Sequence, residues 1–295
     1  MVAGAALAAG LMSPASAEEP VDAPETSTTE NSSSNAATTA DTAIEAQVAA
    51  RSQGTRVEVL SERTESSVTF AEPDGTFTSE TSTGVERVRD TSGDNGWREI
   101  DLTLRSADGV VQPVSPLHDL TLNGGSLDAP LVELAAGDAS IGFDWTGAGL
   151  PEPVLDGPRA TYADVDENVD LVVEATRYGF EHYLILQEKP ADTSEAAIEL
   201  PVLSEGLTLA EADGAVEVVD DDGQTVGQVG TAFMWGSDGE HIEDAGHTTL
   251  PIEADSLDVA EVSVEESNGA QTLVVDPGKD FLDEATYPVT IDPSV

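Results

Sequence analysis

Two of the four histidines, His241 and His247, stand in a glycine-containing stretch that is rich in acids. Glu240, Glu243 and Asp244 lie beside or between them, so imidazole and carboxylate ligands occur together. This combination is of the kind that binds zinc. The five residues that separate the two histidines match no familiar zinc spacing. We interpret the stretch as a solvated polar loop and keep metal binding as the alternative.

Two runs of aspartates offer the oxygen ligands that calcium prefers. Asp220 and Asp222 belong to the run DDDG at 220–223, which separates two valine-rich stretches. Asp and Gly are the usual turn formers, and an EF-hand would also need a distant bidentate glutamate, so this run predicts a hairpin tip. Asp164, Asp166 and Asp170 recur at short spacing before an expected strand, where a calcium site is conceivable. We therefore expect no cofactor and keep calcium as the alternative.

Motifs that would carry catalysis are missing from the sequence. It contains no G-x-S-x-G elbow, no phosphate loop and no dinucleotide fingerprint. Glycosidases use two positioned carboxylates, but among 58 acids the presence of a pair carries no information. Aromatic residues make up only 4% of the chain, and we expect Trp97, Trp145 and Trp235 to fill cores. We expect no enzyme and nominate no catalytic residue, with a carbohydrate-active hydrolase as an alternative.

Charge and composition exclude several classes of function. The 295 residues include 11 Lys and Arg against 58 Asp and Glu, which gives a formal net charge of −47. Nucleic-acid binding draws its affinity from clustered Lys and Arg, so a nucleic-acid partner is excluded. The chain has no cysteine, which excludes disulfides and thiolate metal sites. No apolar stretch approaches the roughly 20 residues that span a bilayer, so we expect no membrane insertion.

The first 54 residues predict an export signal and a spacer. Residues 1–17 are uncharged and apolar and end in Ala15-Ser16-Ala17, which fits a signal-peptidase site; because the basic region is missing, we expect a truncated signal peptide. Residues 18–54 are rich in Ser, Thr and Glu and predict a disordered spacer. Within it, residues 41–53 predict one short helix that begins at Asp41, ends at Gly54 and places Ile44, Val48 and Ala49 on one face.

After Gly54 the sequence predicts antiparallel sheets in a sandwich-like, all-β arrangement. Short runs of Val, Leu, Thr and Phe alternate with polar residues and are separated by Gly, Asp, Asn and Pro. We expect a hairpin at 68–81 and a half-buried strand at 97–104, with turns at Asp74-Gly75, 107–109, 213–214, 222–223 and 268–269. Further strands are expected at 120–122, 131–134, 139–145, 170–174, 183–187, 207–209, 216–219, 226–229, 259–264 and 271–275. Glycines and prolines near 150–157 predict a division into β-rich units at 55–150 and 151–295.

A resemblance sharpens this interpretation. Residues 160–175 read ATYADVDENVDLVVEA and residues 179–186 read GFEHYLIL, followed by EGLTL at 205–209, FMW at 233–235 and TYPVTIDP at 286–293. This combination resembles the N-terminal region of large secreted actinobacterial surface proteins that carry RHS repeats, LamG-like jelly rolls or DNRLRE modules, and it covers residues 55–295. The resemblance implies an N-terminal β domain that leads into repeats, adhesive modules or a toxin-delivery shell. It implies no catalytic residue, and Tyr162 and Val165 are expected to anchor a loop before a strand.

These observations predict a non-catalytic structural or interaction module of a secreted or cell-surface protein. Its expected partners are downstream modules of the same polypeptide, missing after residue 295, or cell-surface components. Its expected location is extracellular, with association to the cell wall as one form. The alternative from a different class is the carbohydrate-active hydrolase that uses a carboxylate pair, and a further alternative is a calcium-stabilised adhesin domain.

Overall fold

The computed structural model describes residues 36–90, 96–126, 129–147, 149–212, 215–238 and 257–292. The expected signal peptide at 1–17, residues 18–35 of the expected spacer and the turn at 213–214 lie outside the described residues. Within the described residues no helix is long and apolar enough to cross a membrane.

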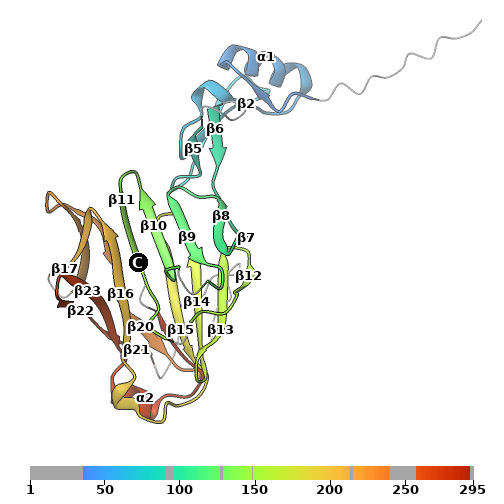
Figure 1. The fold of residues 1–295 in the computed structure, drawn as a ribbon. Coiled ribbons are helices and arrows are strands. Elements are labelled where there is room, and N and C mark those ends of the chain that lie inside the picture. Colours follow the sequence, from blue (N-terminus) through green and yellow to red (C-terminus); the bar gives the residue numbers. More distant parts are fainter. Residues whose placement is uncertain are drawn as a thin grey trace, which may run out of the picture.

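The first described elements form a small α/β unit, at the top of Figure 1. Its strands follow the order β1 (Thr39–Ala40), β2 (Val57–Val59), β3 (Ser67–Ala71) and β4 (Phe77–Thr81), with a 3-10 turn at Leu60–Glu62. Strand β1 pairs with β2 in parallel, and helix α1 (Ala43–Gln53) connects the two. The hairpin expected at 68–81 is confirmed as β3 and β4, with Gly75 at a positive φ of 94°.

Helix α1 confirms the predicted element but not its predicted face. Thr42, not Asp41, caps the helix in a capping box with Glu45, and Gly54 ends it in the left-handed conformation at φ 74°. The buried face consists of Ala46 and Ala50, whereas Ile44 and Val48 are 78% and 66% exposed. The small alanine side chains let the helix lie close to the small sheet. The prediction assumed instead that the larger apolar side chains would face inward, and this assumption was wrong.

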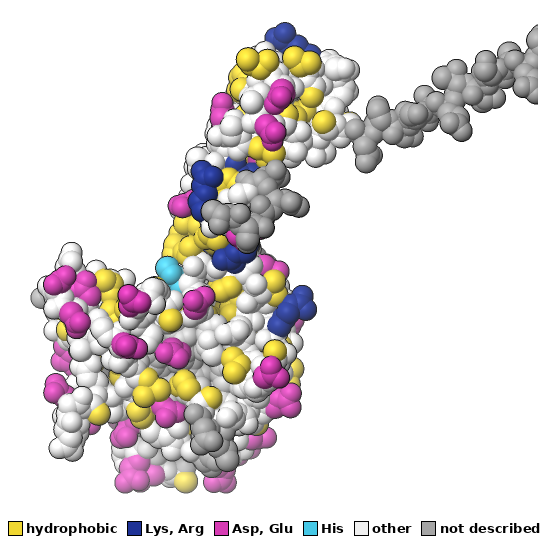
Figure 2. Space-filling view, turned by 45° about the horizontal axis from the view of Figure 1, so that its top comes forward, with side chains coloured by type: hydrophobic (Ala, Val, Ile, Leu, Met, Phe, Trp, Pro, Cys, Tyr) yellow, Lys and Arg dark blue, Asp and Glu magenta, His cyan; other side chains and the backbone are white. Residues whose placement is uncertain are grey.

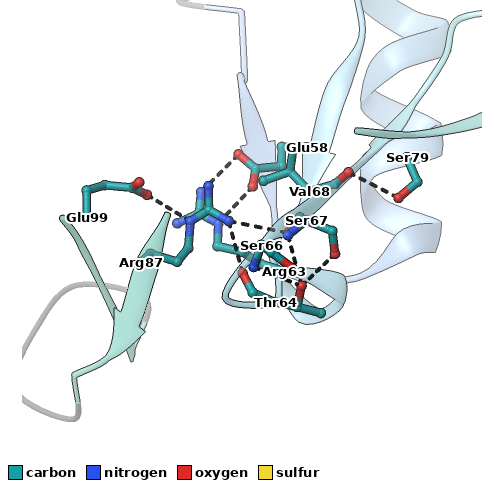
Figure 3. Close-up of polar contacts among 9 residues, drawn as sticks. All are labelled: Glu58, Arg63, Thr64, Ser66, Ser67, Val68, Ser79, Arg87 and Glu99. Atoms are coloured by element: carbon teal, nitrogen blue, oxygen red, sulfur yellow. Dashed lines mark hydrogen bonds and ion pairs between the residues drawn. The ribbon is translucent and has the colours of Figure 1, made fainter. Parts of the chain in front are cut away.

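A two-stranded neck joins this unit to the rest of the molecule, as Figure 1 shows, and consists of β5 (Arg87–Arg89) and β6 (Trp97–Glu99). Arg87 is only 9% exposed. Its guanidinium donates to the carbonyls of Thr64 at 2.9 Å and Ser67 at 3.4 Å and pairs with Glu99 at 3.1 Å. Figure 3 shows these bonds beside the Arg63–Glu58 ion pair, which lies within the small unit, so Arg87 holds the neck against that unit.

The body below the neck is a β-sandwich of two large antiparallel sheets (Figure 1). One sheet has the order β22 (Glu261–Ser267), β23 (Ala270–Asp276), β16 (Ile198–Glu205), β11 (Ala139–Phe143), β10 (Val132–Ala136), β9 (Asp119–Asn123), β8 (Val110–Ser115) and β7 (Asp101–Ala107). The other has the order β12 (Val154–Asp156), β13 (Arg159–Asp166), β14 (Val169–Ala175), β15 (Phe180–Leu186), β24 (Val289–Asp292), β20 (Phe233–Trp235) and β21 (Leu257–Val259). A third sheet contains β17 (Leu207–Ala212), β18 (Ala215–Asp220) and β19 (Thr225–Val229).

One hydrophobic core lies between these sheets. It includes Phe143 and Leu200 from the first large sheet, Leu171 and Phe180 from the second, and Val218 from the third. A second cluster closes one end, where helix α2 (Lys279–Glu284) buries Leu282 completely. Strand β8 alternates buried and exposed side chains as predicted, whereas β14 and β15 are buried along most of their length. The all-β class is confirmed.

Strands from both sides of the expected division at 150 share this core. Gly142 of β11 is paired with Leu203 of β16, and β16 in turn pairs with β23, so the first sheet contains strands from 101–143 and from 198–276. The glycines and prolines at 150–157 mark the passage from one sheet to the other, not the end of a separate core.

Several strand predictions are corrected by the sheet assignment. The strand expected at 97–104 is interrupted at Ile100, because β6 belongs to the neck and β7 to the body. The strand expected at 259–264 is likewise interrupted at Ala260, since β21 and β22 lie in different large sheets. Tyr162 and Val165, expected to anchor a loop, lie within β13, which carries a bulge between Tyr162 and Asp166.

Candidate functional site

The aspartates proposed to bind calcium mostly accept hydrogen bonds from their own turns. Asp170 accepts from the backbone N–H of Asp164 at 2.9 Å and from the side chain of Gln187 at 2.8 Å. Asp166 accepts from the backbone N–H of Glu167 at 2.7 Å. The fold therefore brings Asp164 and Asp170 together at the β13–β14 turn. Among the described residues, no three His, Cys, Asp or Glu side chains form a group that could hold a metal ion.

The predicted hairpin tip at 220–223 is confirmed between β18 and β19. Asp220 accepts from the backbone N–H groups of Asp222 at 3.0 Å and Gln224 at 2.8 Å, and Gly223 has a positive φ of 74°. These bonds are typical of an aspartate that forms a turn. His241 and His247 lie outside the described residues. Calcium binding stays a prediction, and a melting curve with calcium and with chelator tests it through a shift of the midpoint.

His182, which no sequence pattern singled out, is completely buried in the sandwich core. Its ring lies 6.0 Å from that of Phe143 and 6.3 Å from that of Phe180, and neither ring nitrogen has a hydrogen-bond partner among the described residues. Burial lowers the pKa of His182 to about 4, because the charged form would be desolvated. We therefore interpret His182 as a neutral imidazole that packs in the core, and we assign it no role in binding.

A buried polar group lies on the opposite face of the same strands. Glu174 is 0% exposed and accepts from Arg159 at 2.9 Å, and the hydroxyl of Tyr183 donates to Glu181. Burial, followed by the hydrogen bond to Glu181, raises the pKa of Tyr183 far above its usual value. The ion pair joins β13 to β14 and is a structural feature of the second large sheet.

A hollow opens at the end of the sandwich away from the neck. The β14–β15 turn contacts the neck, where Arg177 pairs with Glu86 at 3.2 Å. The opposite ends of these strands line a cavity of about 500 Å³. Its walls are the segment 145–147, the β13–β14 turn at 166–169 and the connection 188–199 between β15 and β16. A cavity of this size between two sheets is typical of a small-ligand site.

Trp145, expected in the core, lines this cavity and is only partly buried. The next residues hold its segment against β16, since Thr146 donates to the carbonyl of Glu199 at 3.3 Å. A Cβ at Gly147 would lie 2.3 Å from the indole nitrogen of Trp145, so only glycine allows this close approach. The other two tryptophans differ: Trp235 is 2% exposed, and Trp97 lies under the guanidinium of Arg89 at 4.0 Å in the neck.

Acidic side chains dominate the cavity and the surface around it. Figure 2 shows Asp and Glu spread over the visible face of the body, with few Lys and Arg among them. Lys189 is the one lysine or arginine that lines the cavity, and it pairs with Asp283 at 2.7 Å. Hydrogen bonds from Lys189 and then from Lys279 hold the pKa of the Asp283 carboxyl well below its usual range.

Sequence reasoning missed this site because it assigned no structure to residues 188–199. The missing signal is the motif Asp192-Thr193-Ser194, in which Asp192 caps a 3-10 turn and accepts from the backbone N–H of Ser194 at 3.0 Å. This motif predicts an ordered turn, and an ordered turn within a long connection between two strands indicates a structured segment. The strand β16 that follows was missed as well.

Comparisons with protein-family models, with curated proteins and with solved structures found no match for this chain. The hydrolase alternative stays a prediction, which an assay of glycan cleavage tests.

Proposed function

We propose that this chain is a non-catalytic structural and interaction module of a secreted or cell-surface protein. It holds adjoining parts of the same polypeptide, or components of the cell surface, at a fixed spacing. The resemblance of residues 55–295 to large secreted surface proteins belongs to this proposal. The observation that carries it is the continuous core that joins strands from 101–143 and 154–292 into one body.

A module that holds its neighbours at a fixed spacing must resist bending between its small unit and its body. The contacts at the neck provide this resistance. Arg87 binds two carbonyls of the small unit, and Tyr178 of the body accepts from the backbone N–H of Val85 at 3.3 Å. The Arg177–Glu86 ion pair lies at the same junction. Both ends of the neck are therefore tied by hydrogen bonds between segments far apart in sequence.

The acidic surface supports a role outside the cell. A net charge of −47 keeps such a body soluble and repels other acidic chains, while it favours encounters with cationic groups. Asp170 and Asp220 accept hydrogen bonds from backbone N–H groups of their own turns, which supports a structural role for these two carboxylates.

Protease treatment of intact cells of the organism that encodes the chain tests this proposal. We expect an added protease to cut the chain in intact cells, while a cytoplasmic marker protein stays whole. Protection of the chain until the cells are lysed would contradict an extracellular role. Cleavage of a glycan panel by the purified chain would contradict the non-catalytic part of the proposal.

A further inference from the structure

The cavity at the far end of the sandwich has an apolar floor. Leu184 and Leu186 line it and are 1% and 7% exposed, so the cavity reaches the edge of the hydrophobic core. Trp145 and Ile198 line it from the side of the first large sheet. An aliphatic chain that entered the cavity would replace water against these side chains, which favours binding.

The rim of the cavity carries unpaired negative charge. Glu167, Glu188, Glu195 and Glu199 line the cavity and are exposed, and their carboxylates make no ion pair or hydrogen bond with any described residue. The amine of Lys189, the one cation that lines the cavity, is already bound to Asp283. A ligand that enters must therefore bring positive charge if it is to match the rim.

The arrangement of these carboxylates does not suit a metal ion. Within the described part of the chain, no three acidic or histidine side chains converge closely enough to coordinate one. Dispersed carboxylates around an apolar floor instead match a cation that is attached to an aliphatic stem. An indole beside the floor adds a surface that attracts ammonium and guanidinium groups.

We propose that this cavity binds an ammonium or guanidinium group on an aliphatic stem. Such a group occurs in the lysine or arginine side chain of a partner protein and in free polyamines. The stem contacts Trp145, Leu186 and Ile198, and the cationic end lies among Glu188, Glu195 and Glu199. This binding does not depend on where the chain is located, so it can fail or succeed apart from the proposed function.

Calorimetric titration of the full chain at low salt tests the proposal. The probes are 1,6-diaminohexane for free polyamines and N-acetyl-lysine-N-methylamide for a partner side chain, with 1,6-hexanediol as the uncharged match. We expect saturable binding of one equivalent of at least one cationic probe and no binding of the diol. Binding of the diamine alone would point to polyamines, and binding of the lysine derivative alone would point to a protein partner.

Two triple variants separate a specific site from bulk charge. Glu188→Gln with Glu195→Gln and Glu199→Gln neutralises the rim, and we expect this to weaken binding about tenfold. Glu205→Gln with Glu261→Gln and Glu265→Gln removes the same charge from exposed positions elsewhere and should change affinity by less than about twofold. Equal weakening in both variants, equal binding of the diol, or no saturable binding by the wild type would overturn the proposal.

The wild type alone supplies a second readout if a variant does not fold. The indole N–H resonance of Trp145 should shift on addition of the cationic probe, while that of the buried Trp235 should not. A titration in which neither resonance moves, or both move alike, would contradict binding in the cavity.

Discussion

Replacement of His182 by leucine should make the fold less sensitive to acid. The imidazole is 0% exposed, lies beside the rings of Phe143 and Phe180, and faces Val173 across the β14–β15 pair. Leucine has a similar volume and leaves no polar atom without a partner. At neutral pH the substitution should therefore stabilise the protein by about 1–3 kcal/mol, the usual cost of an unsatisfied buried polar group.

The pH dependence follows from the direction of the pKa shift. The pKa of His182 is about 4 in the folded protein and about 6.5 in an unfolded chain. The unfolded chain therefore binds more protons between these values, and stability is fully present above about pH 6.5 and is lost as the pH falls towards 4. Between pH 7 and pH 4.5 the loss from this one group amounts to about 2.5 kcal/mol.

Urea unfolding at pH 7 and pH 4.5 measures this loss. The free energy of unfolding of the wild type should fall by about 2.5 kcal/mol more than that of His182→Leu, because carboxylates titrate equally in both. His118→Gln, which removes a partly exposed histidine, should behave as the wild type does. If the wild type and His182→Leu lose the same free energy, the neutral, unpartnered state assigned to His182 is wrong.

Three other substitutions have defined outcomes. Gly147→Ala should displace the indole of Trp145, lower stability by about 1–3 kcal/mol and alter the near-ultraviolet circular dichroism, and an unchanged spectrum would contradict the close approach. Glu174→Gln should lower the free energy of unfolding in urea by about 3 kcal/mol, because its arginine partner loses a buried counter-charge; a loss below about 1 kcal/mol would contradict this. Arg87→Ala should expose the neck to limited proteolysis, whereas the exposed Arg105→Ala should not, and equal cleavage of both would refute the role of the neck arginine.

The sequence predicted local features well where a turn fixes the chain. Asp108-Gly109 and Asn268-Gly269 adopt positive φ at both residues, as tight hairpins require. The strand expected at 271–275, directly after the second turn, is confirmed as β23. The class of fold followed from period-two alternation along these strands.

Long-range pairing could not be predicted from local patterns. Strand β16 joins two parts of the first sheet, yet residues 198–205 contain Pro201 and two glutamates and carry a weak strand signal. Its partners in β11 and β23 lie about 60 and 70 residues away along the chain. The alternation of residues within a strand does not indicate which distant strand it pairs with. The expected division at 150 has the same cause, because glycines and prolines mark a change of sheet as readily as a change of domain.

The cavity escaped prediction for a related reason. Trp145, Leu186 and Glu199 meet only after the two sheets have packed, and each alone resembles an ordinary core or surface residue. Glu188 and Glu195 are likewise two acids among 58 in the sequence, and only the fold places them around one opening.

The proposed structural role depends on residues 101–143 and 154–292 forming a single body. Native-state hydrogen exchange at increasing urea concentration tests this most directly. The amides of β11, β14 and β16 should exchange through one shared opening reaction, so their free energies of opening should converge to the same value with the same dependence on urea. Strands on the two sides of residue 150 that opened separately, with different free energies, would contradict the account.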